Sequence, residues 1–121
     1  MKILVVEDEI GLGKVVCRML TALGHEPTHV CTGDEAIGVL EGVDLVLSDI
    51  RMPGRLNGVQ VRAIAHSRGI PTLLMTGWTD LTGQLGFTGK PILAKPFTAE
   101  ELALRIKEAM EFAAEFFPRR D

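Results

Sequence analysis

Five polar side chains with complementary chemistry follow the apolar runs of this 121-residue sequence. Glu7 and Asp8 follow the first run, Asp49 the third, Thr76 the fourth and Lys95 the last. Crowded carboxylates raise one another's pKa, and a divalent cation relieves their repulsion. Such oxygen ligands suit Mg²⁺, and a metal ion, an amine and a hydroxyl together stabilise a phosphoryl group in transfer. Because a carboxylate can be the nucleophile, the set predicts metal-assisted phosphoryl chemistry on a carboxylate.

Asp49 is the predicted nucleophile because of its place in the chain. An apolar run at 45–47 leads into it, and Met52, Pro53 and Gly54 break the chain shortly afterwards. A charged group at the end of a buried strand costs several kcal/mol unless a partner compensates it. We expect that partner to be an amine and a metal ion.

The chain alternates apolar runs with segments of helical periodicity, and this order predicts how the polar residues meet. We expect strands at 2–6, 28–31, 44–48, 71–75 and 92–94, and helices at 10–22, 34–40, 59–66 and 98–117. Asp34 is the predicted N-cap of the second helix, and Thr98 with Glu101 forms a capping box on the last. Alternating strands and helices predict an α/β fold with a parallel sheet covered on both faces. Ligands bind at the carboxyl ends of such strands.

Composition and charge narrow the functional classes. A hydrophobic share of 46% and a charged share of 24% are typical of a single domain over 1–121. The net charge of −3 offers no basic surface for nucleic acid. No apolar run approaches the roughly 20 residues that span a bilayer, and three acids at 7–9 interrupt any signal peptide. We expect a cytoplasmic protein with neither nucleic-acid nor membrane partners.

The cysteines and histidines predict no further site. Cys17 and Cys31 lack the CxxC spacing and lie in apolar surroundings, which favours buried, reduced thiols. His25 and His29 could share a helical face, but Pro27 lies between them, which disfavours a helix and hence a metal pair there.

Four motifs, in this order and spacing, carry a resemblance: "VVEDE", "LSDIRMPG", "LLMTGW" and "LAKPF". Together they resemble the receiver domain of bacterial two-component response regulators, over essentially the whole chain. The resemblance implies a flavodoxin-like, doubly wound (βα)5 fold with strand order 2-1-3-4-5. It also implies a phosphoacceptor protein that receives its phosphoryl group from a sensor histidine kinase or a phosphotransfer protein and acts on an unknown downstream protein. Apart from phosphorylating and dephosphorylating itself, such a domain is not an enzyme.

The resemblance also implies roles for the residues that match it. Asp49 corresponds to the aspartate that accepts the phosphoryl group. Asp8 corresponds to the direct Mg²⁺ ligand, and Glu7 to a residue that acts largely through a metal-bound water. The carboxylate of Asp49 and the main-chain carbonyl of Arg51 complete the implied ligands. 

The side chains at four positions have further roles in the family pattern. Thr76 corresponds to the switch hydroxyl that moves to the phosphoryl oxygens, and Lys95 pairs with the phosphoryl group or with the free aspartate. Arg51 and Trp78 occupy positions that tune the lifetime of the phosphoryl group in this family.

Three features depart from the family pattern. Ile92 stands where receivers usually place the switch aromatic, and "TGW" at 76–78 resembles a subgroup that lacks that aromatic. If the chain belongs to this subgroup, Trp78 would take over part of the role of the switch aromatic. The alternative is that Trp78 is a partly exposed loop residue without such a role. The segment 77–94 holds four glycines, so we expect a fourth helix of low stability. If phosphorylation orders this segment, the switch is an order–disorder change rather than a rigid shift. Gly58 lies nine residues after the acceptor, one more than is commonest, which we expect to affect partner choice.

The last predicted helix is longer than covering a small sheet requires. Its core-facing stripe comprises Leu102, Ile106, Ala109, Met110, Ala113 and Phe117. Leu104, Phe112 and Phe116 fall outside or at the edge of this stripe. They are either scattered exposed apolar residues or a partner surface, such as one for a homodimer. We expect a single-domain regulator without an output domain, or else a fragment of a larger regulator or hybrid kinase.

Two other functions compete with this interpretation. A haloacid-dehalogenase-type phosphatase needs a second aspartate two residues after the nucleophile as its proton donor, and Arg51 occupies that place. The second is a receiver-like scaffold that works without phosphorylation. The presence of the acids, Thr76 and Lys95 gives it no support, but Ile92 at the position of the switch aromatic keeps it open.

Overall fold

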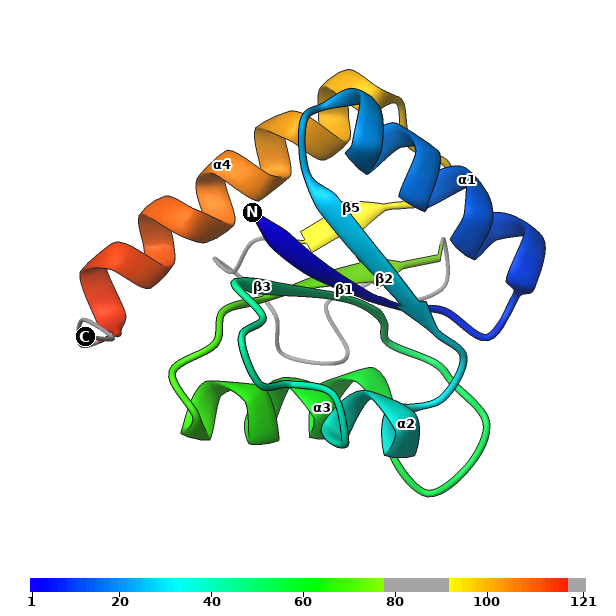
Figure 1. The fold of residues 1–121 in the computed structure, drawn as a ribbon, viewed down its shortest axis with the longest axis vertical. Coiled ribbons are helices and arrows are strands. Elements are labelled where there is room, and N and C mark those ends of the chain that lie inside the picture. The colour runs from blue at the N-terminus through cyan, green and yellow to red at the C-terminus, as the bar shows by residue number, and fades with distance from the viewer. Residues whose placement is uncertain (78–91, 118–121) are drawn as a thin grey trace.

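The computed structural model describes residues 1–77 and 92–117. A five-stranded sheet forms its centre, in the order β2-β1-β3-β4-β5 with all neighbours parallel (Figure 1). The strands are β1 Lys2–Val6, β2 Glu26–Val30, β3 Leu45–Asp49, β4 Thr72–Thr76 and β5 Ile92–Ala94. The helices are α1 Ile10–Ala22, α2 Gly33–Ile37, α3 Gly58–Ser67 and α4 Ala99–Phe116. The expected α/β fold and its strand order are confirmed.

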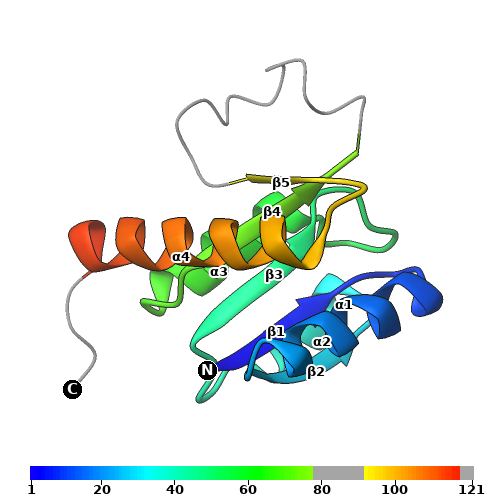
Figure 2. The same cartoon turned by 90° about the horizontal axis from the view of Figure 1, so that it is seen from above.

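Helices cover both faces of the sheet, α1 and α4 on one side and α2 and α3 on the other (Figure 1). Side chains of β1 divide between the two faces. Ile3 and Val5 pack with α1 and α4, whereas Leu4 and Val6 pack with α2 and α3. Figure 2 shows α4 lying along β4 and β5, and α1 along β1 and β2. A sheet buried on both faces accounts for the continuous apolar runs in the sequence.

Sequence signals place the ends of α1 and α4 well. α1 begins and ends at the predicted residues. At the start of α4 the Thr98 hydroxyl accepts a hydrogen bond from the Glu101 N–H at 3.1 Å, and the Glu101 carboxylate accepts one from the Thr98 N–H at 3.2 Å. The predicted capping box is therefore confirmed.

The prediction for α2 is wrong at both ends. Thr32, not Asp34, is the N-cap, since its hydroxyl accepts a hydrogen bond from the Glu35 N–H at 3.1 Å. Asp34 instead lies in the first turn, where its charge still interacts favourably with the helix dipole. The helix ends at Ile37 rather than at residue 40, because Gly38 follows as its C-cap.

β2 and β3 also differ slightly from their predicted bounds. Glu26 and Pro27 join β2 because their main chain pairs with Lys2 and Ile3 of β1. Proline is tolerated there because β2 is an edge strand. Asp49 is the last residue of β3 rather than the first residue after it, so its backbone is held by the sheet.

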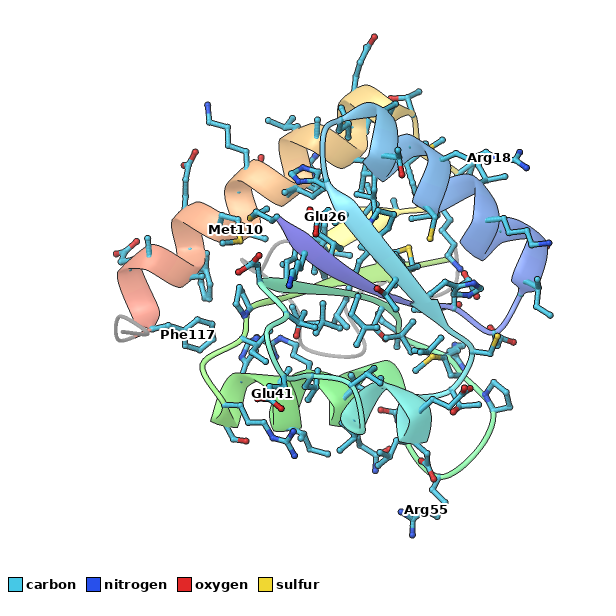
Figure 3. The ribbon with its side chains drawn as sticks, viewed as in Figure 1. Arg18, Glu26, Glu41, Arg55, Met110 and Phe117 are labelled. Carbon is cyan, nitrogen blue, oxygen red and sulfur yellow. The ribbon has the colours of Figure 1, made fainter. Side chains whose placement is uncertain are left out.

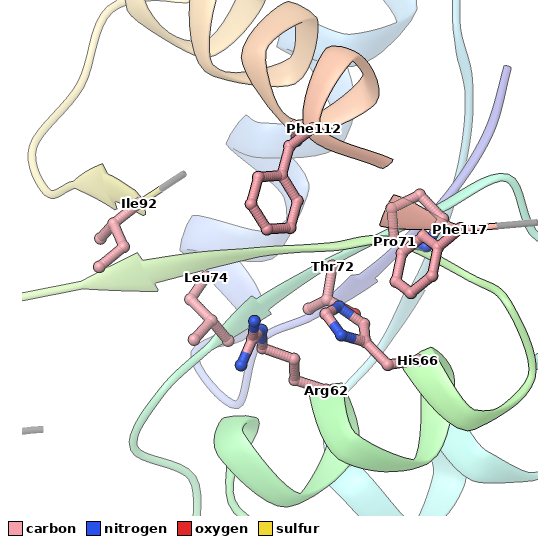
Figure 4. A pocket seen from close by; sticks show the side chains of 9 residues that line it. Arg62, His66, Pro71, Thr72, Leu74, Ile92, Phe112 and Phe117 are labelled. Carbon is pink, nitrogen blue, oxygen red and sulfur yellow. The ribbon is translucent and has the colours of Figure 1, made fainter. Parts of the chain in front are cut away.

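The outer side of α4 is only partly as predicted. Leu104 is 49% exposed, in agreement with its place outside the stripe. Phe112, expected to be exposed, is half-buried and lines a small pocket with Arg62 and His66 of α3 (Figure 4). The Phe117 ring meets the His66 ring edge-on, with 4.8 Å between centroids. Phe112 thus faces a pocket that it shares with side chains of α3 rather than open solvent.

Thr72 lines the same pocket and gives a prediction about stability (Figure 4). Its hydroxyl, on a residue only 7% exposed, is the one buried side-chain polar atom without a hydrogen-bond partner among the described residues. Since such a group costs about 1–3 kcal/mol, Thr72→Val should raise the free energy of unfolding in urea by about 1 kcal/mol. The exposed Thr28 of β2 is a matched control, with Thr28→Val changing stability by less than about 0.5 kcal/mol. A destabilised Thr72→Val protein would show that the hydroxyl is satisfied in solution.

Several predictions fall on residues 78–91 and 118–121, which lie outside the described residues. They include the role of Trp78 and the short fourth helix. No helix in the described ranges is long and apolar enough to cross a membrane. Cys17 and Cys31 are free thiols but are half-buried rather than fully buried as expected, and burial raises the pKa of the Cys17 thiol.

Candidate phosphoacceptor site

Three carboxylates converge at the carboxyl ends of β1 and β3. Glu7 and Asp8 directly follow β1, and Asp49 closes β3, its parallel neighbour in the sheet. One oxygen atom from each of the three lies within 4.8 Å of the other two. Glu7 is 1% exposed, Asp49 is half-buried and Asp8 is exposed. The cluster therefore has a buried side and a side open to solvent.

Lys95 connects two of these carboxylates. Its Nζ atom donates hydrogen bonds to Glu7 Oε1 at 2.7 Å and to Asp49 Oδ2 at 2.9 Å. The Lys95 N–H donates to the Thr76 carbonyl at 2.8 Å, and the peptide bond to Pro96 is cis. The Lys95 side chain is 22% exposed. The expected pairing of the amine with Asp49 is present, and Glu7 is a second partner.

Burial and charge shift the pKa of two groups at the site. Burial raises the pKa of Glu7 above 4.5, although hydrogen bonds from Lys95 and from the Glu9 N–H lower it. Burial by itself lowers the pKa of Lys95, but its hydrogen bonds to Glu7 and Asp49 outweigh burial and raise the pKa above 10.5. The amine is therefore charged at neutral pH. Three acids face one amine, which leaves an excess of negative charge for a cation to neutralise.

Thr76 lies at the carboxyl end of β4, whereas Ile92 is the first residue of β5 and pairs with Leu74. Thr76, 1% exposed, ends β4, and its hydroxyl donates to the Gly77 carbonyl at 2.8 Å. The hydroxyl is thus at the predicted edge of the sheet but bonded to the following loop. Ile92 is half-buried and packs against Ile50 and Leu74, and its side chain offers no polar group.

The two arginines of the loop after β3 have different surroundings. Arg51 is exposed two residues after the end of β3, and its main-chain carbonyl remains a predicted metal ligand. The Arg55 guanidinium lies 3.3 Å from Asp34 in the first turn of α2, is 84% exposed, and points away from the sheet (Figure 3). Exposed pairs of this kind contribute roughly 0–1 kcal/mol, so the extra loop charge is directed to α2 rather than to the carboxylates.

Gly58 brings the end of this loop against the end of β3. Its N–H donates to the Ile50 carbonyl at 2.8 Å. A β-carbon on Gly58 would overlap the Asp49 carbonyl oxygen and lie 2.8 Å from Ile50 Cα. Because backbone atoms on both sides would have to move, only glycine fits at the start of α3.

We therefore expect Gly58→Ala to lower the free energy of unfolding by about 1–3 kcal/mol, the usual cost of overpacking. Gly11→Ala is the matched control, since Gly11 lies in α1 with nothing within 4 Å of an added β-carbon. That change should raise stability by about 0.5–1 kcal/mol. Urea denaturation of the two variants measures both changes in the free energy of unfolding. Equal stability of Gly58→Ala and wild type would contradict the close approach of Gly58 to the backbone of Asp49 and Ile50.

His29 and Gly13 contact the site in a way that no sequence pattern indicated. His29 Nε2 lies 2.8 Å from the main-chain oxygen of Glu7, and a β-carbon on Gly13 would overlap the His29 ring. His25 lies before β2, with its Nδ1 3.2 Å from the Met1 amine. The two histidines therefore have partners at opposite ends of β2. Only the register of β1 with β2 reveals the His29 contact, and residue spacing carries no signal for it.

Comparison with known proteins decides the family. Residues 3–107 match the family model of the response regulator receiver domain. This chain belongs to the response regulator receiver domain family. The match spans all four strand ends that carry Glu7, Asp49, Thr76 and Lys95, so the resemblance of the motifs is confirmed.

The receiver domain is also similar to curated proteins and to solved structures. It is 34% identical over 119 residues to the uncharacterized transcriptional regulatory protein YcbL of Bacillus subtilis, covering 93% of this chain and 52% of that protein. It is 31% identical over 120 residues to the transcriptional regulatory protein ResD of Bacillus subtilis, covering 94% and 50%. The chain thus spans about half the length of these relatives. The crystal structure of a response regulator receiver protein from Sinorhizobium medicae superposes with a TM-score of 0.81 at 28% identity, covering 93% and 96%.

Proposed function

We propose that this receiver domain is a phosphoacceptor switch of a two-component system or phosphorelay in the cytoplasm. Asp49 takes a phosphoryl group from a phosphohistidine on a sensor histidine kinase or a phosphotransfer protein. One observation carries the proposal: the Lys95 amine bridges Asp49 and Glu7 at the edge where Asp8 opens to solvent. A nucleophilic carboxylate, a fixed positive charge and two further acids are the groups that phosphoryl transfer to an aspartate needs.

The proposed transfer takes place on the side chain of Asp49. One carboxylate oxygen attacks the phosphorus atom, the P–N bond breaks with its electron pair returning to the imidazole, and an acyl phosphate forms. Lys95 then shifts its hydrogen bond from the carboxylate to a phosphoryl oxygen while keeping its bond to Glu7. The Thr76 hydroxyl exchanges the Gly77 carbonyl for another phosphoryl oxygen. Attack by water on phosphorus later breaks the P–O bond to Asp49, which restores the carboxylate and releases inorganic phosphate with the protons of the water.

The carboxylate cluster fits Mg²⁺. All its donors are oxygens within 4.8 Å of one another, and the exposed side leaves room for water ligands. Asp8, Asp49 and the Arg51 carbonyl would hold the ion directly. Glu7 would act through water, because its two oxygens already accept hydrogen bonds from Lys95 and the Glu9 N–H. When bound, the ion neutralises charge on the phosphoryl oxygens.

Titration with Mg²⁺, followed by NMR or calorimetry, tests this site. Asp8→Asn should weaken Mg²⁺ binding by at least about 10-fold, because a carboxylate is the stronger ligand for a hard cation. Glu41→Gln, at an exposed acid outside the cluster, is the control and should bind as wild type does. Equal affinity of Asp8→Asn and wild type would contradict the ligand set.

The proposal is of a switch and not of an enzyme with an external substrate. Turnover of a phosphoester needs a proton donor for the leaving group. The position two residues after Asp49, where the rival phosphatase chemistry places an acid, holds the exposed Arg51. The output is therefore a change in protein–protein contacts, for which Thr76 at the end of β4 is the proposed sensor.

A further inference from the structure

The ladder between β1 and β2 ends just before the acidic cluster. Val6 and Val30 are its last paired residues, and the Glu7 N–H still donates to the Val30 carbonyl at 3.1 Å. β2 then ends, so no further strand residue is placed to bond the Glu7 carbonyl. His29 takes over this position, with Nε2 2.8 Å from the Glu7 oxygen.

The direction of this hydrogen bond follows from its partners. A carbonyl oxygen can only accept, so Nε2 of His29 carries the hydrogen and donates it. Gly13 of α1 lies close against the ring, since a β-carbon there would overlap the imidazole. The half-buried ring is therefore held between α1 and the end of β1.

The Glu7 carbonyl belongs to the peptide unit that joins Glu7 to Asp8. The orientation of that unit determines how two consecutive side chains diverge, one buried against Lys95 and one exposed. Both must bring an oxygen to within 4.8 Å of Asp49. A donor that fixes this peptide plane therefore fixes the geometry of the acidic pair.

We propose that His29 is a positioning residue for the acidic pair Glu7 and Asp8, acting through the peptide unit between them. This role rests on the proposed function, since it matters for phosphoryl transfer only if the pair serves the cation. His29 donates one hydrogen bond to the main chain and touches neither the cation nor the phosphoryl group. Groups that orient metal ligands typically contribute 10–100-fold to metal affinity.

Two substitutions separate the hydrogen bond from the packing of the ring. His29→Gln keeps an N–H donor at about the same reach as Nε2, whereas His29→Leu keeps an apolar volume and removes the donor. We expect His29→Leu to weaken Mg²⁺ binding about 10-fold and to slow phosphorylation by acetyl phosphate, with His29→Gln within about 3-fold of wild type. Both proteins must unfold cooperatively, which circular dichroism checks.

Displacing the ring through its neighbour provides a second variant. Gly13→Ala should move the imidazole off the Glu7 carbonyl and weaken Mg²⁺ binding as His29→Leu does. Gly11→Ala, two residues earlier on α1, adds a β-carbon with nothing within 4 Å and should leave the affinity for Mg²⁺ unchanged. Since a lower melting temperature alone would also accompany a merely structural role, the affinity of the folded proteins is the deciding quantity.

A measurement without metal tests the hydrogen bond itself. In ¹H–¹⁵N spectra of the metal-free wild type, the proton of the His29 ring should reside on Nε2, and the Asp8 amide resonance should move in His29→Leu but not in His29→Gln. A proton on Nδ1 alone, or folded His29→Leu with wild-type Mg²⁺ affinity, would overturn the role of His29. Wild-type protein that binds Mg²⁺ but takes no phosphoryl group would overturn the proposed function while leaving the positioning role in place. Wild-type protein that binds no Mg²⁺ would overturn both.

Discussion

Asp49→Asn should abolish phosphoryl incorporation while leaving the fold intact. An amide is not a nucleophile for phosphoryl transfer, but its carbonyl oxygen can keep the hydrogen bond that Asp49 Oδ2 now accepts from Lys95 at 2.9 Å. Because asparagine has nearly the same size, we expect the free energy of unfolding to change by no more than about 1 kcal/mol. Intact mass after incubation with acetyl phosphate and Mg²⁺ should show one phosphoryl group on the wild type and none on the variant.

Asp34→Asn is the matched control for this experiment. Asp34 is an exposed aspartate paired with the exposed Arg55, and it lies outside the carboxylate cluster. The Asp34→Asn protein should take up the phosphoryl group to the same extent as wild type. A phosphoryl group that is still added to a folded Asp49→Asn protein would show that another residue is the acceptor.

Lys95→Met should have the largest effect on stability. The change leaves Glu7, 1% exposed, without the amine that now donates to it at 2.7 Å. Removing one partner of a buried ion pair costs about 3–5 kcal/mol. Since the Lys95 side chain is 22% exposed, we expect the lower end of this range, a decrease of about 3 kcal/mol in the free energy of unfolding at neutral pH. Urea denaturation in the presence of EDTA measures it without the contribution of bound cations.

The stability deficit of Lys95→Met should depend on pH. Burial already raises the pKa of Glu7 above 4.5, and the hydrogen bond from Lys95 lowers it, so removing the amine raises the pKa of Glu7 further. A carboxyl group whose pKa is higher in the folded than in the unfolded protein stabilises the fold at pH values below its unfolded pKa. This contribution is lost as the pH rises through the folded pKa. The deficit relative to wild type should therefore be smallest near pH 5 and largest near pH 8, by roughly 1 kcal/mol or more.

A double variant separates the buried charge from the lost packing. In Glu7→Gln/Lys95→Met the buried charge of Glu7 is gone and only the half-buried Asp49 lacks the amine, so much of the lost stability should return and its pH dependence should become smaller. A deficit in Lys95→Met that is the same at both pH values, and is not relieved by Glu7→Gln, would contradict the role assigned to the buried pair.

The sequence predicts the strand ends of this receiver domain because three physical signals agree there. Apolar runs end abruptly, a charged or hydroxyl residue follows, and helical periodicity begins again. Parallel strands then bring Asp49, Thr76 and Lys95 to one edge without any knowledge of side-chain geometry. The capping box of α4 is equally local, since Thr98 and Glu101 need only each other.

The contacts that the sequence does not predict depend on strand register or on competing caps. Lys95 reaches Glu7 as well as Asp49 only because β1 and β3 are adjacent. His29 meets the Glu7 carbonyl only because β2 ends where it does. Thr32 and Asp34 are both residue types that favour the N-cap position. Thr32 is the cap because α2 begins at Gly33.

Mapping the phosphoryl group chemically tests the central proposal most directly. The wild-type protein is incubated with acetyl phosphate and Mg²⁺, its acyl phosphate is reduced with borohydride, and the peptides are sequenced by mass spectrometry. The proposal predicts that the residue at position 49 alone is converted to homoserine, and only in samples that contained Mg²⁺. Conversion at another carboxylate, or phosphorylation that does not need the cation, would contradict it.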